Sequence, residues 1–247
     1  MKAMILAAGK GTRMLPLTEK LPKPLIPIQG MTLLGHTIAW LKFYGIKDII
    51  INTHHHAGQI VDYIGNNNSF GIHIEFSDET GQLLDTGGGL KKAQHFFDTD
   101  EPFVLTSSDV ITDLNLTEMV RFHKAKDPLV TLAVKHRAST RDFIFDHNYR
   151  LCGWHNNITG ESKTIREVEK PYRIAFSTIH VISPRIFPLI VEEGKFSIID
   201  LYLRMASDQL ITGFEHDDSG WFECGKYENL PQLNQNPQIA AIYKKYH

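Results

Sequence analysis

The stretch Ile-Leu-Ala-Ala-Gly-Lys-Gly-Thr-Arg-Met-Leu-Pro-Leu-Thr-Glu-Lys-Leu-Pro-Lys-Pro-Leu-Ile-Pro-Ile, residues 5–28, decides the fold and much of the function. An apolar strand there leads into a turn that contains Gly9 and Gly11. We expect both glycines to adopt positive φ and to bring bare N–H groups to anionic oxygens. Arg13 can fork onto phosphate oxygens, and Lys23 can add a point charge. The segment therefore predicts a site for a triphosphate.

The loop is expected to be partly ordered in advance, because prolines at positions 16, 22, 24 and 27 fix φ along it. Two other phosphate-binding motifs do not fit. A dinucleotide fingerprint needs glycine where Met14 stands, and an acid where the second strand runs into Thr53 and His54. A P-loop needs Gly-Lys-Ser/Thr at a helix start, and the sequence contains no such stretch. These mismatches exclude the common NAD motif and remove the main support for a kinase or ATPase.

The same segment resembles the signature of the sugar-1-phosphate nucleotidyltransferase family. That signature reads Leu-Ala-x-Gly-x-Gly-Thr-Arg, then Pro-Leu-Thr, then Pro-Lys-Pro, and residues 6–13, 16–18 and 22–24 match it. The resemblance implies a Rossmann-like α/β fold, with a mostly parallel central sheet flanked by helices and a small antiparallel β insertion. It also implies transfer of a nucleoside monophosphate from a nucleoside triphosphate to a sugar-1-phosphate, with release of pyrophosphate (EC 2.7.7 class).

The resemblance assigns roles to residues of the first loop. Arg13 and Lys23 would be catalytic, with Arg13 on the β- and γ-phosphates and Lys23 on the α-phosphate or the sugar phosphate. The nucleotide-binding residues implied by the pattern are Ala7, Ala8, Gly9, Gly11 and Thr12.

Composition sets modest limits. A chain of 247 residues with 42% hydrophobic content can bury one large core, so we expect a single domain over 1–247. Within it we expect a nucleotide-binding half (1–135), a sugar-phosphate-binding half (136–225) and a C-terminal helical segment (226–247). The net charge of −2 gives no global field for nucleic acid or membranes, and two cysteines suit a reducing cytoplasm. We therefore expect small-molecule partners only, a cytoplasmic location, and a monomer or homodimer.

Apolar runs alternate with helical patterns along the first 135 residues, which indicates βαβ units. Predicted helices cover residues 33–44, 59–64 and 90–97, and predicted strands cover residues 3–7, 49–53, 72–76, 103–106 and 130–134. Shorter β segments from about residue 141 indicate the antiparallel insertion. Ligands bind at the carboxyl ends of strands in such sheets, which places residues 9–13, 85–89 and 109 along one rim.

Asp109 follows a buried strand on that rim and is predicted to bind Mg²⁺, which prefers one or two carboxylates plus phosphate oxygens. The alternative role for Asp109 is to cap the helix that begins near Asn115. Trp-Phe-Glu-Cys-Gly, residues 221–225, resembles the family segment that completes the metal site, with Glu223 where the family has Asp. Asp217 and Asp218 are alternative ligands. Ser108 also departs from the family, which usually has Gly at this position.

A second glycine-rich element, Leu-Asp-Thr-Gly-Gly-Gly at residues 84–89, precedes a predicted helix start. The family resemblance places Thr86, Gly87 and Gly88 beside the nucleotide, whereas the structural alternative is a tight strand-to-helix turn.

The acceptor half carries a further resemblance. Glu169-Lys170-Pro171 resembles a tripeptide that many family members place beside the sugar phosphate, and Thr178 stands where the family has Gly. We expect Glu169, Lys170 and Thr178 to contact the sugar phosphate.

The substrate pair follows from two clues that conflict. Thr-Gly-Gly-Gly resembles the N-acetylmuramate-1-phosphate uridylyltransferases of cell-wall biosynthesis, although these often lack Glu-Lys-Pro. UTP with an amino-sugar-1-phosphate is the first expectation. A guanylyl- or cytidylyltransferase and a catalytically weak nucleotide-sugar-binding homologue are the alternatives.

Overall fold

The centre of the fold is a set of four parallel strands in the order β6-β1-β4-β5. The computed structural model describes residues 1–246. Successive residues of β1 pack on opposite faces, with Met4 in one hydrophobic cluster and Ala3 and Ile5 in another, as the alternation of side chains in a strand requires. The four strands are β1 (Ala3–Leu6), β4 (Asp48–Thr53), β5 (His73–Asp78) and β6 (Phe103–Ser107).

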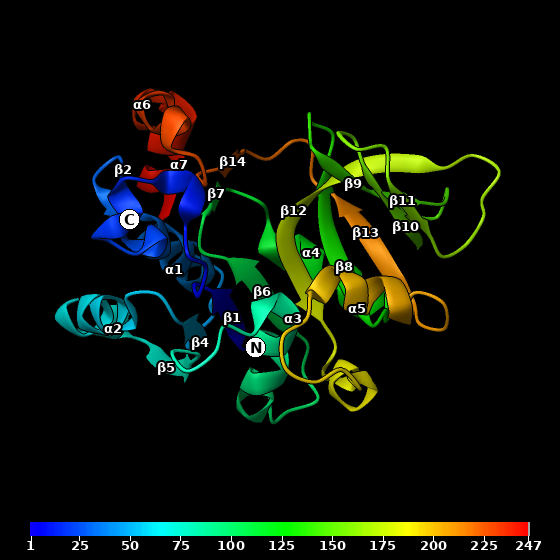
Figure 1. Ribbon diagram of the computed structural model, residues 1–247, viewed down its shortest axis with the longest axis horizontal. Coiled ribbons are helices and arrows are strands. Elements are labelled where there is room, and N and C mark those ends of the chain that lie inside the picture. The colour runs from blue at the N-terminus through cyan, green and yellow to red at the C-terminus, as the bar shows by residue number, and fades with distance from the viewer. Residues whose placement is uncertain (247) are drawn as a thin grey trace.

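Six further strands extend the same sheet into ten. β12 pairs antiparallel with β6, β8 and β9, and β10 and β11 continue antiparallel beyond β9. β13 pairs parallel with β8. These strands are β8 (Val130–Lys135), β9 (Arg141–Phe145), β10 (Leu151–Asn156), β11 (Ser162–Thr164), β12 (Tyr172–Ile182) and β13 (Ile211–Glu215). The antiparallel strands therefore continue the main sheet, and Figure 1 shows β9, β10 and β11 at the opposite end from β4 and β5.

Helices cover both faces of the sheet. Side chains of α1, α2 and α4 belong to one hydrophobic cluster, and those of α3 and α5 belong to the other. The N-termini of α1, α4 and α5 are capped by the side chains of Thr32, Asn115 and Ser197. The helices are α1 (Leu33–Phe43), α2 (Ala57–Asn66), α3 (Asp85–Lys92), α4 (Leu116–Lys126), α5 (Ile198–Met205), α6 (Leu230–Gln235) and α7 (Pro237–Tyr246).

Two small antiparallel sheets lie beyond the main one. β2 (Pro27–Ile28) pairs with β3 (Met31–Thr32), and β7 (Val110–Thr112) pairs with β14 (Trp221–Glu223). A third hydrophobic cluster joins the glycine-rich segment, these sheets and the last helices through Met14, Ile111 and Ile239. The C-terminal helices α6 and α7 thus lie beside the N-terminal loop, as Figure 1 shows.

The fold class is confirmed as a mixed sheet with parallel central strands flanked by helices. The helix predicted to begin after the three glycines begins before them, at Asp85, so Gly87, Gly88 and Gly89 lie inside α3. Within residues 1–246, no helix combines the length and the apolar character needed to cross a bilayer. The predicted C-terminal segment also includes His247, which lies outside the described residues.

Candidate active site

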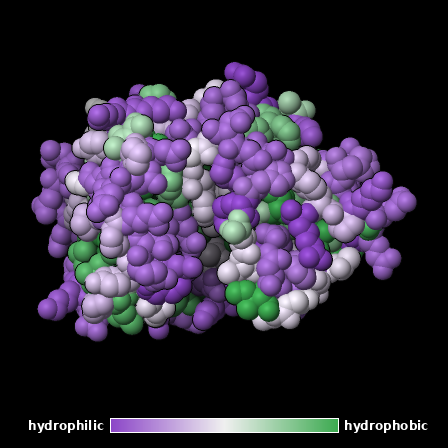
Figure 2. All heavy atoms as spheres, turned by 90° about the horizontal axis from the view of Figure 1, so that it is seen from above, coloured by the Kyte–Doolittle hydropathy of each residue, from purple (hydrophilic) through white to green (hydrophobic). Residues whose placement is uncertain are grey.

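A cleft of about 1170 Å³ opens where the parallel strands end. Leu6 at the end of β1, Ser107 at the end of β6 and Thr178 in β12 all line it. Its remaining walls come from the antiparallel strands, the start of α5 and the β14 segment. Figure 2 shows the molecule from above, with hydrophilic side chains over most of this face and a hollow near its middle. The cleft therefore occupies the position that α/β sheets use for ligands.

Two acids and two cations meet at one end of this cleft. Lys23 Nζ pairs with Asp109 Oδ2, and Arg13 Nη1 lies 3.1 Å from Glu223 Oε1. The pairing of β14 with β7 sets Glu223 opposite Val110, and the Cys224 N–H donates to the Asp109 carbonyl over 2.8 Å. This strand pairing brings residues that are more than one hundred positions apart to one point.

Gly225 marks that point. A Cβ atom at Gly225 would lie 3.2 Å from both Arg13 Nη2 and Asp109 Oδ2, and 3.4 Å from Glu223 Oε1. Two carboxylates that face one small space fit a divalent cation, since Mg²⁺ uses one or two protein carboxylates beside phosphate oxygens. The residues present therefore fit the metal that the family resemblance implies.

Asp109 is held in its charged form. Burial raises the pKa of its carboxyl group, but the charge and hydrogen bond of Lys23, with the Ser107 hydroxyl and the charge of Arg13, outweigh it. The net pKa lies below the ordinary value. The helix-capping alternative for Asp109 is wrong, because Asn115 caps α4.

Asp217 does not join Asp109. Its carboxylate accepts hydrogen bonds from the His136 backbone N–H at 2.8 Å and pairs with His136 Nδ1 at 2.6 Å. Together with Glu215 these residues form an exposed cluster outside the cleft lining. Glu223 is the carboxylate that lies with Asp109 beside Gly225, and its binding of a metal stays a prediction.

The first glycine-rich loop is rigidly built, with one difference from expectation. Gly11 has φ +65°, and a Cβ there would lie 2.8 Å from Thr18 Cγ2, so only glycine fits. Thr18 also donates its hydroxyl hydrogen to the Gly11 carbonyl over 3.0 Å. Gly9 was expected to adopt positive φ and does not. Thr12 begins a short 3₁₀ turn that carries Arg13 toward Glu223.

A buried polar network behind this loop escaped the sequence analysis. Asn52 Oδ1 accepts from the Ala7 N–H at 2.7 Å, and Asn52 Nδ2 donates to Glu79 Oε1 at 2.8 Å. The other Glu79 oxygen accepts from the Leu84 N–H at 2.9 Å. Glu79 is 1% exposed, so its carboxylate binds protein rather than ligand. Isolated Asn and Glu residues carry no pattern that could have predicted a link between the two glycine-rich loops.

The second glycine-rich element receives part of the protein itself. A Cβ at Gly87 would lie 2.5 Å from the Phe196 ring, and one at Gly88 would lie 2.3 Å from the Gly194 carbonyl oxygen. Thr86 Oγ1 accepts from the Ile198 N–H at 2.9 Å and also lines the cleft. The strand-to-helix turn offered as the structural alternative is wrong, because Gly87 and Gly88 lie inside α3, where these contacts leave no room for a side chain. Nucleotide contact stays a prediction for Thr86, Gly87 and Gly88.

The part of the cleft lined by residues 136–225, called the acceptor half because the sugar phosphate is expected there, differs from the expected residue set. Glu169 and Lys170 are exposed and are absent from the cleft lining, so their contact with a sugar phosphate stays a prediction. Thr178 does line the cleft, and its Oγ1 lies 2.9 Å from Ser107 Oγ. Arg137 and Trp221, which sequence analysis did not single out as ligand-binding residues, also line this half.

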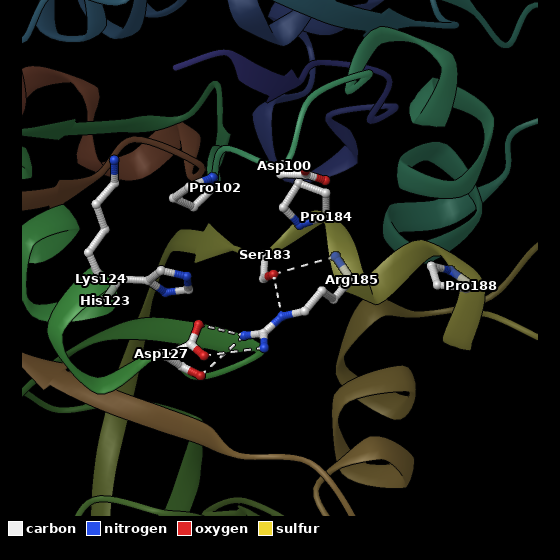
Figure 3. Close-up of a pocket in the computed structure, with 9 residues that line it drawn as sticks. All are labelled: Asp100, Pro102, His123, Lys124, Asp127, Ser183, Pro184, Arg185 and Pro188. Carbon is white, nitrogen blue, oxygen red and sulfur yellow. Dashed lines mark hydrogen bonds and ion pairs between the residues drawn. The ribbon is translucent and has the colours of Figure 1, made fainter.

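A second cavity, of about 500 Å³, lies between α4 and the 3₁₀ turn Pro184–Leu189 (Figure 3). Arg185 Nη2 pairs with Asp127 Oδ1 at 2.7 Å, and Arg185 Nε donates to Ser183 Oγ at 2.9 Å. Burial lowers the pKa of His123, which also lines this cavity, to about 4. Arg185 and Asp127 thus satisfy each other, and we assign this cavity no chemistry.

The strand-end cleft, the glycine turn and the two acid–cation pairs define a phosphate-handling α/β protein. The chain belongs to the nucleotidyl transferase family, whose pattern matches residues 2–237.

Two curated relatives and one solved structure illustrate the similarity. The chain is 41% identical over 251 residues to N-acetylmuramate alpha-1-phosphate uridylyltransferase of Neisseria meningitidis, covering 99% of this chain and 100% of that protein. It is 30% identical to UTP–glucose-1-phosphate uridylyltransferase of Synechocystis, covering 98% of this chain but only 66% of that longer protein. UDP-glucose pyrophosphorylase from Acinetobacter baumanii has the same fold, with a TM-score of 0.77, 14% identity, and coverage of 99% and 97% of the two chains.

Proposed function

We propose that this protein transfers uridine monophosphate from UTP to an amino-sugar-1-phosphate such as N-acetylmuramate-1-phosphate. The observation that carries the proposal is the convergence of Arg13, Lys23, Asp109 and Glu223 on the space beside Gly225. The full-length similarity to a uridylyltransferase supports the choice of UTP and of the sugar. Two buried free cysteines are compatible with the cytoplasmic location that we also propose.

The reaction needs positioning and charge neutralisation rather than a protein nucleophile. An oxygen of the sugar-1-phosphate forms a bond to the α-phosphorus, and the bond to the bridging oxygen of the β-phosphate breaks. Pyrophosphate leaves with the electron pair of that bond. Arg13 is half exposed at the cleft and can fork onto the leaving phosphates, while Lys23 can neutralise the transferring one.

Asp109 and Glu223 would hold Mg²⁺, the metal that we propose. When bound, the ion supplies positive charge against the phosphate oxygens as charge develops on them. Each acid forms an ion pair, Asp109 with Lys23 and Glu223 with Arg13, and these pairs orient both carboxylates at the cleft. The charge and hydrogen bond of Lys23 also lower the pKa of Asp109. In this proposal Lys23 and Arg13 therefore orient the two carboxylates in addition to binding phosphate.

The test is pyrophosphate release with magnesium across UTP, GTP, CTP, ATP and dTTP. Each nucleotide is paired with the 1-phosphates of N-acetylmuramate, N-acetylglucosamine, mannose and glucose. A signal with UTP and an amino-sugar phosphate is expected. A signal with GTP and mannose-1-phosphate would instead make the protein a guanylyltransferase, and nucleotide binding with no turnover would favour the binding homologue.

The same assay tests Lys23. We expect Lys23→Ala to lower kcat by about 30- to 1000-fold, the effect of losing one preorganised donor worth about 2–4 kcal/mol. Lys20→Ala is the matched control, because Lys20 is an exposed lysine of the same loop, whereas Lys23 is largely buried against Asp109. An unchanged kcat for Lys23→Ala would remove Lys23 from the catalytic set.

A further inference from the structure

Arg137 is a cation of the cleft that has no part in the reaction described above. It lies in the acceptor half, where Lys170 is absent from the lining. Its guanidinium carbon is 4.0 Å from the centroid of the Trp221 ring, a stacking distance for a cation over an aromatic face. Trp221 is two residues before Glu223 on β14, so both side chains project from the same side of that strand. Arg137 therefore packs against β14, the strand that carries Glu223.

The guanidinium of Arg137 is placed rigidly. Nη2 donates to the Phe176 carbonyl at 2.6 Å, and Nη1 donates to the Ala138 carbonyl at 3.2 Å. The Trp221 indole N–H is in turn fixed on the Ser177 carbonyl at 2.9 Å. The preceding residue, His136, is held by Asp217 through both its backbone and its ring. The cation is thus preorganised, which lowers the entropic cost of binding a ligand.

The charge of Arg137 has no counter-ion among the residues that the structure describes. Among residues 1–246, no carboxylate lies within salt-bridge distance of it, and its Nε is buried without a hydrogen-bond partner. Burial lowers the pKa of Arg137, and the more distant charges of Glu223 and Asp142 only oppose that effect. By contrast, Lys163 in the same cleft is paired with Asp200 at 2.8 Å. A partly buried arginine without a carboxylate partner is costly unless an anion completes it.

We propose that Arg137, stacked on Trp221, is the anion-binding residue of the acceptor half of the cleft. It receives an anionic group of the acceptor, either the 1-phosphate or a carboxylate on the sugar, because a guanidinium fork matches both geometries. The inference rests on the proposed function, since it assumes a sugar-1-phosphate acceptor.

The test compares Arg137→Gln and Arg137→Lys with the wild-type chain in UTP-dependent turnover with magnesium. Two acceptors are used: N-acetylmuramate-1-phosphate, which carries a carboxylate, and N-acetylglucosamine-1-phosphate, which does not. Arg137→Gln should raise the acceptor KM by about 10- to 100-fold, the scale of a lost hydrogen bond to a charged group, with the KM for UTP changed less than twofold. Arg137→Lys retains the charge without the planar fork and should give an intermediate acceptor KM.

The two sources of the anion separate in this comparison. If Arg137 binds the 1-phosphate, the KM rises for both acceptors; if it binds a carboxylate, the KM rises for the muramate acceptor alone. Arg121→Gln is the matched control, since Arg121 is an exposed arginine of α4 outside the cleft lining, and its kinetics should match the wild type. An acceptor KM within twofold of wild type in Arg137→Gln, or an equal rise in the KM for UTP, would overturn the inference.

Failure of the proposed function gives a different result. The wild-type chain would then show no turnover with either acceptor. In that case calorimetric titration with the two sugar phosphates still tests Arg137, because binding needs no chemistry. Binding weakened at least tenfold in Arg137→Gln supports the anion site, and equal binding by wild type and variant overturns it. If Arg137→Gln does not fold, Arg137→Lys carries both tests.

Discussion

Thr178 adopts a backbone conformation that a β-branched residue rarely takes. Its φ is +57°, in the left-handed region, at the irregularity between Phe176 and His180 where β12 pairs with β8. Its hydroxyl shares a hydrogen bond with Ser107, whose own hydroxyl lowers the pKa of Asp109. Strain at Thr178 is therefore retained beside a residue of the acid–cation site, which is where local strain tends to persist.

This strain gives a prediction on stability. Thr178→Gly and Thr178→Ala both remove the hydroxyl, but only glycine tolerates positive φ without cost. The free energy of unfolding should therefore be about 1 kcal/mol higher for Thr178→Gly than for Thr178→Ala. Urea unfolding followed by circular dichroism gives both values. At Ala175, an earlier β12 residue that is not in the left-handed region, the order should reverse, with Ala175→Gly less stable than wild type. Equal stability of the two Thr178 variants would mean that the conformation is not strained.

Single residues differ in how far the sequence predicts them. Arg13, Lys23, Asp109 and Glu223 each belong to a motif at a strand end or a glycine turn, and the fold brings them together. Arg137 belongs to no motif, and its role depends on a ring supplied by Trp221 from a distant strand. Such a contact is set by tertiary packing, which a local pattern does not contain.

At the scale of elements, the three glycines of α3 show why one sequence pattern fits two structures. Glycines before a helix pattern suggest a ligand-binding turn, yet these glycines lie within the helix and accommodate the segment that leads into α5. The Gly87 and Gly88 N–H groups both donate to the Phe196 carbonyl, at 3.0 and 3.3 Å. Both interpretations require a close approach of the backbone, and the sequence does not say what approaches.

Gly88→Ala should destabilise the protein by about 1–3 kcal/mol, because its Cβ would overlap the Gly194 carbonyl oxygen and force the backbone apart. Gly58→Ala is the control on another helix, α2, where a Cβ would meet nothing within 4 Å. That substitution should be neutral or stabilising by up to about 1 kcal/mol, from helix propensity alone. Chemical denaturation of both variants and of the wild-type chain measures these changes in the free energy of unfolding. A Gly88→Ala protein as stable as Gly58→Ala would show that the 194–196 segment is not packed on α3.

At the scale of the whole molecule, the two ends of the chain support one another. The side-chain amide of Gln29 donates to the Leu233 and Asn236 carbonyls at 3.0 and 2.7 Å. The backbone N–H of Gln29 donates to Asn234 Oδ1 at 2.8 Å. The C-terminal helices thus buttress the segment that carries Arg13 and Lys23. The sequence predicts a helical segment over 226–247 but not what it packs against, because long-range packing of this kind has no local signal.

Three buried histidines make the stability of the protein depend on pH. Burial lowers the pKa of His123 and of His216 to about 4 and that of His180 to about 3. His123 Nδ1 is bonded to Thr131 and His180 Nδ1 to Tyr202, whereas His216 lies between Ser177 and Ser219. The folded protein holds these rings neutral, while the unfolded chain protonates them near pH 6.5.

Stability should therefore fall as the pH drops from 7 to 5. In this window the three histidines bind protons in the unfolded chain but stay neutral in the folded protein. The free energy of unfolding therefore decreases by about 1.5 kcal/mol per histidine between pH 6.5 and 5. The pKa of Asp109 lies below its ordinary value of 3.8, so its contribution is lost only at lower pH. Urea unfolding at several pH values measures the slope. His123→Gln should reduce that slope by about one third. A flat profile for the wild-type chain would mean that water reaches these rings in the folded protein.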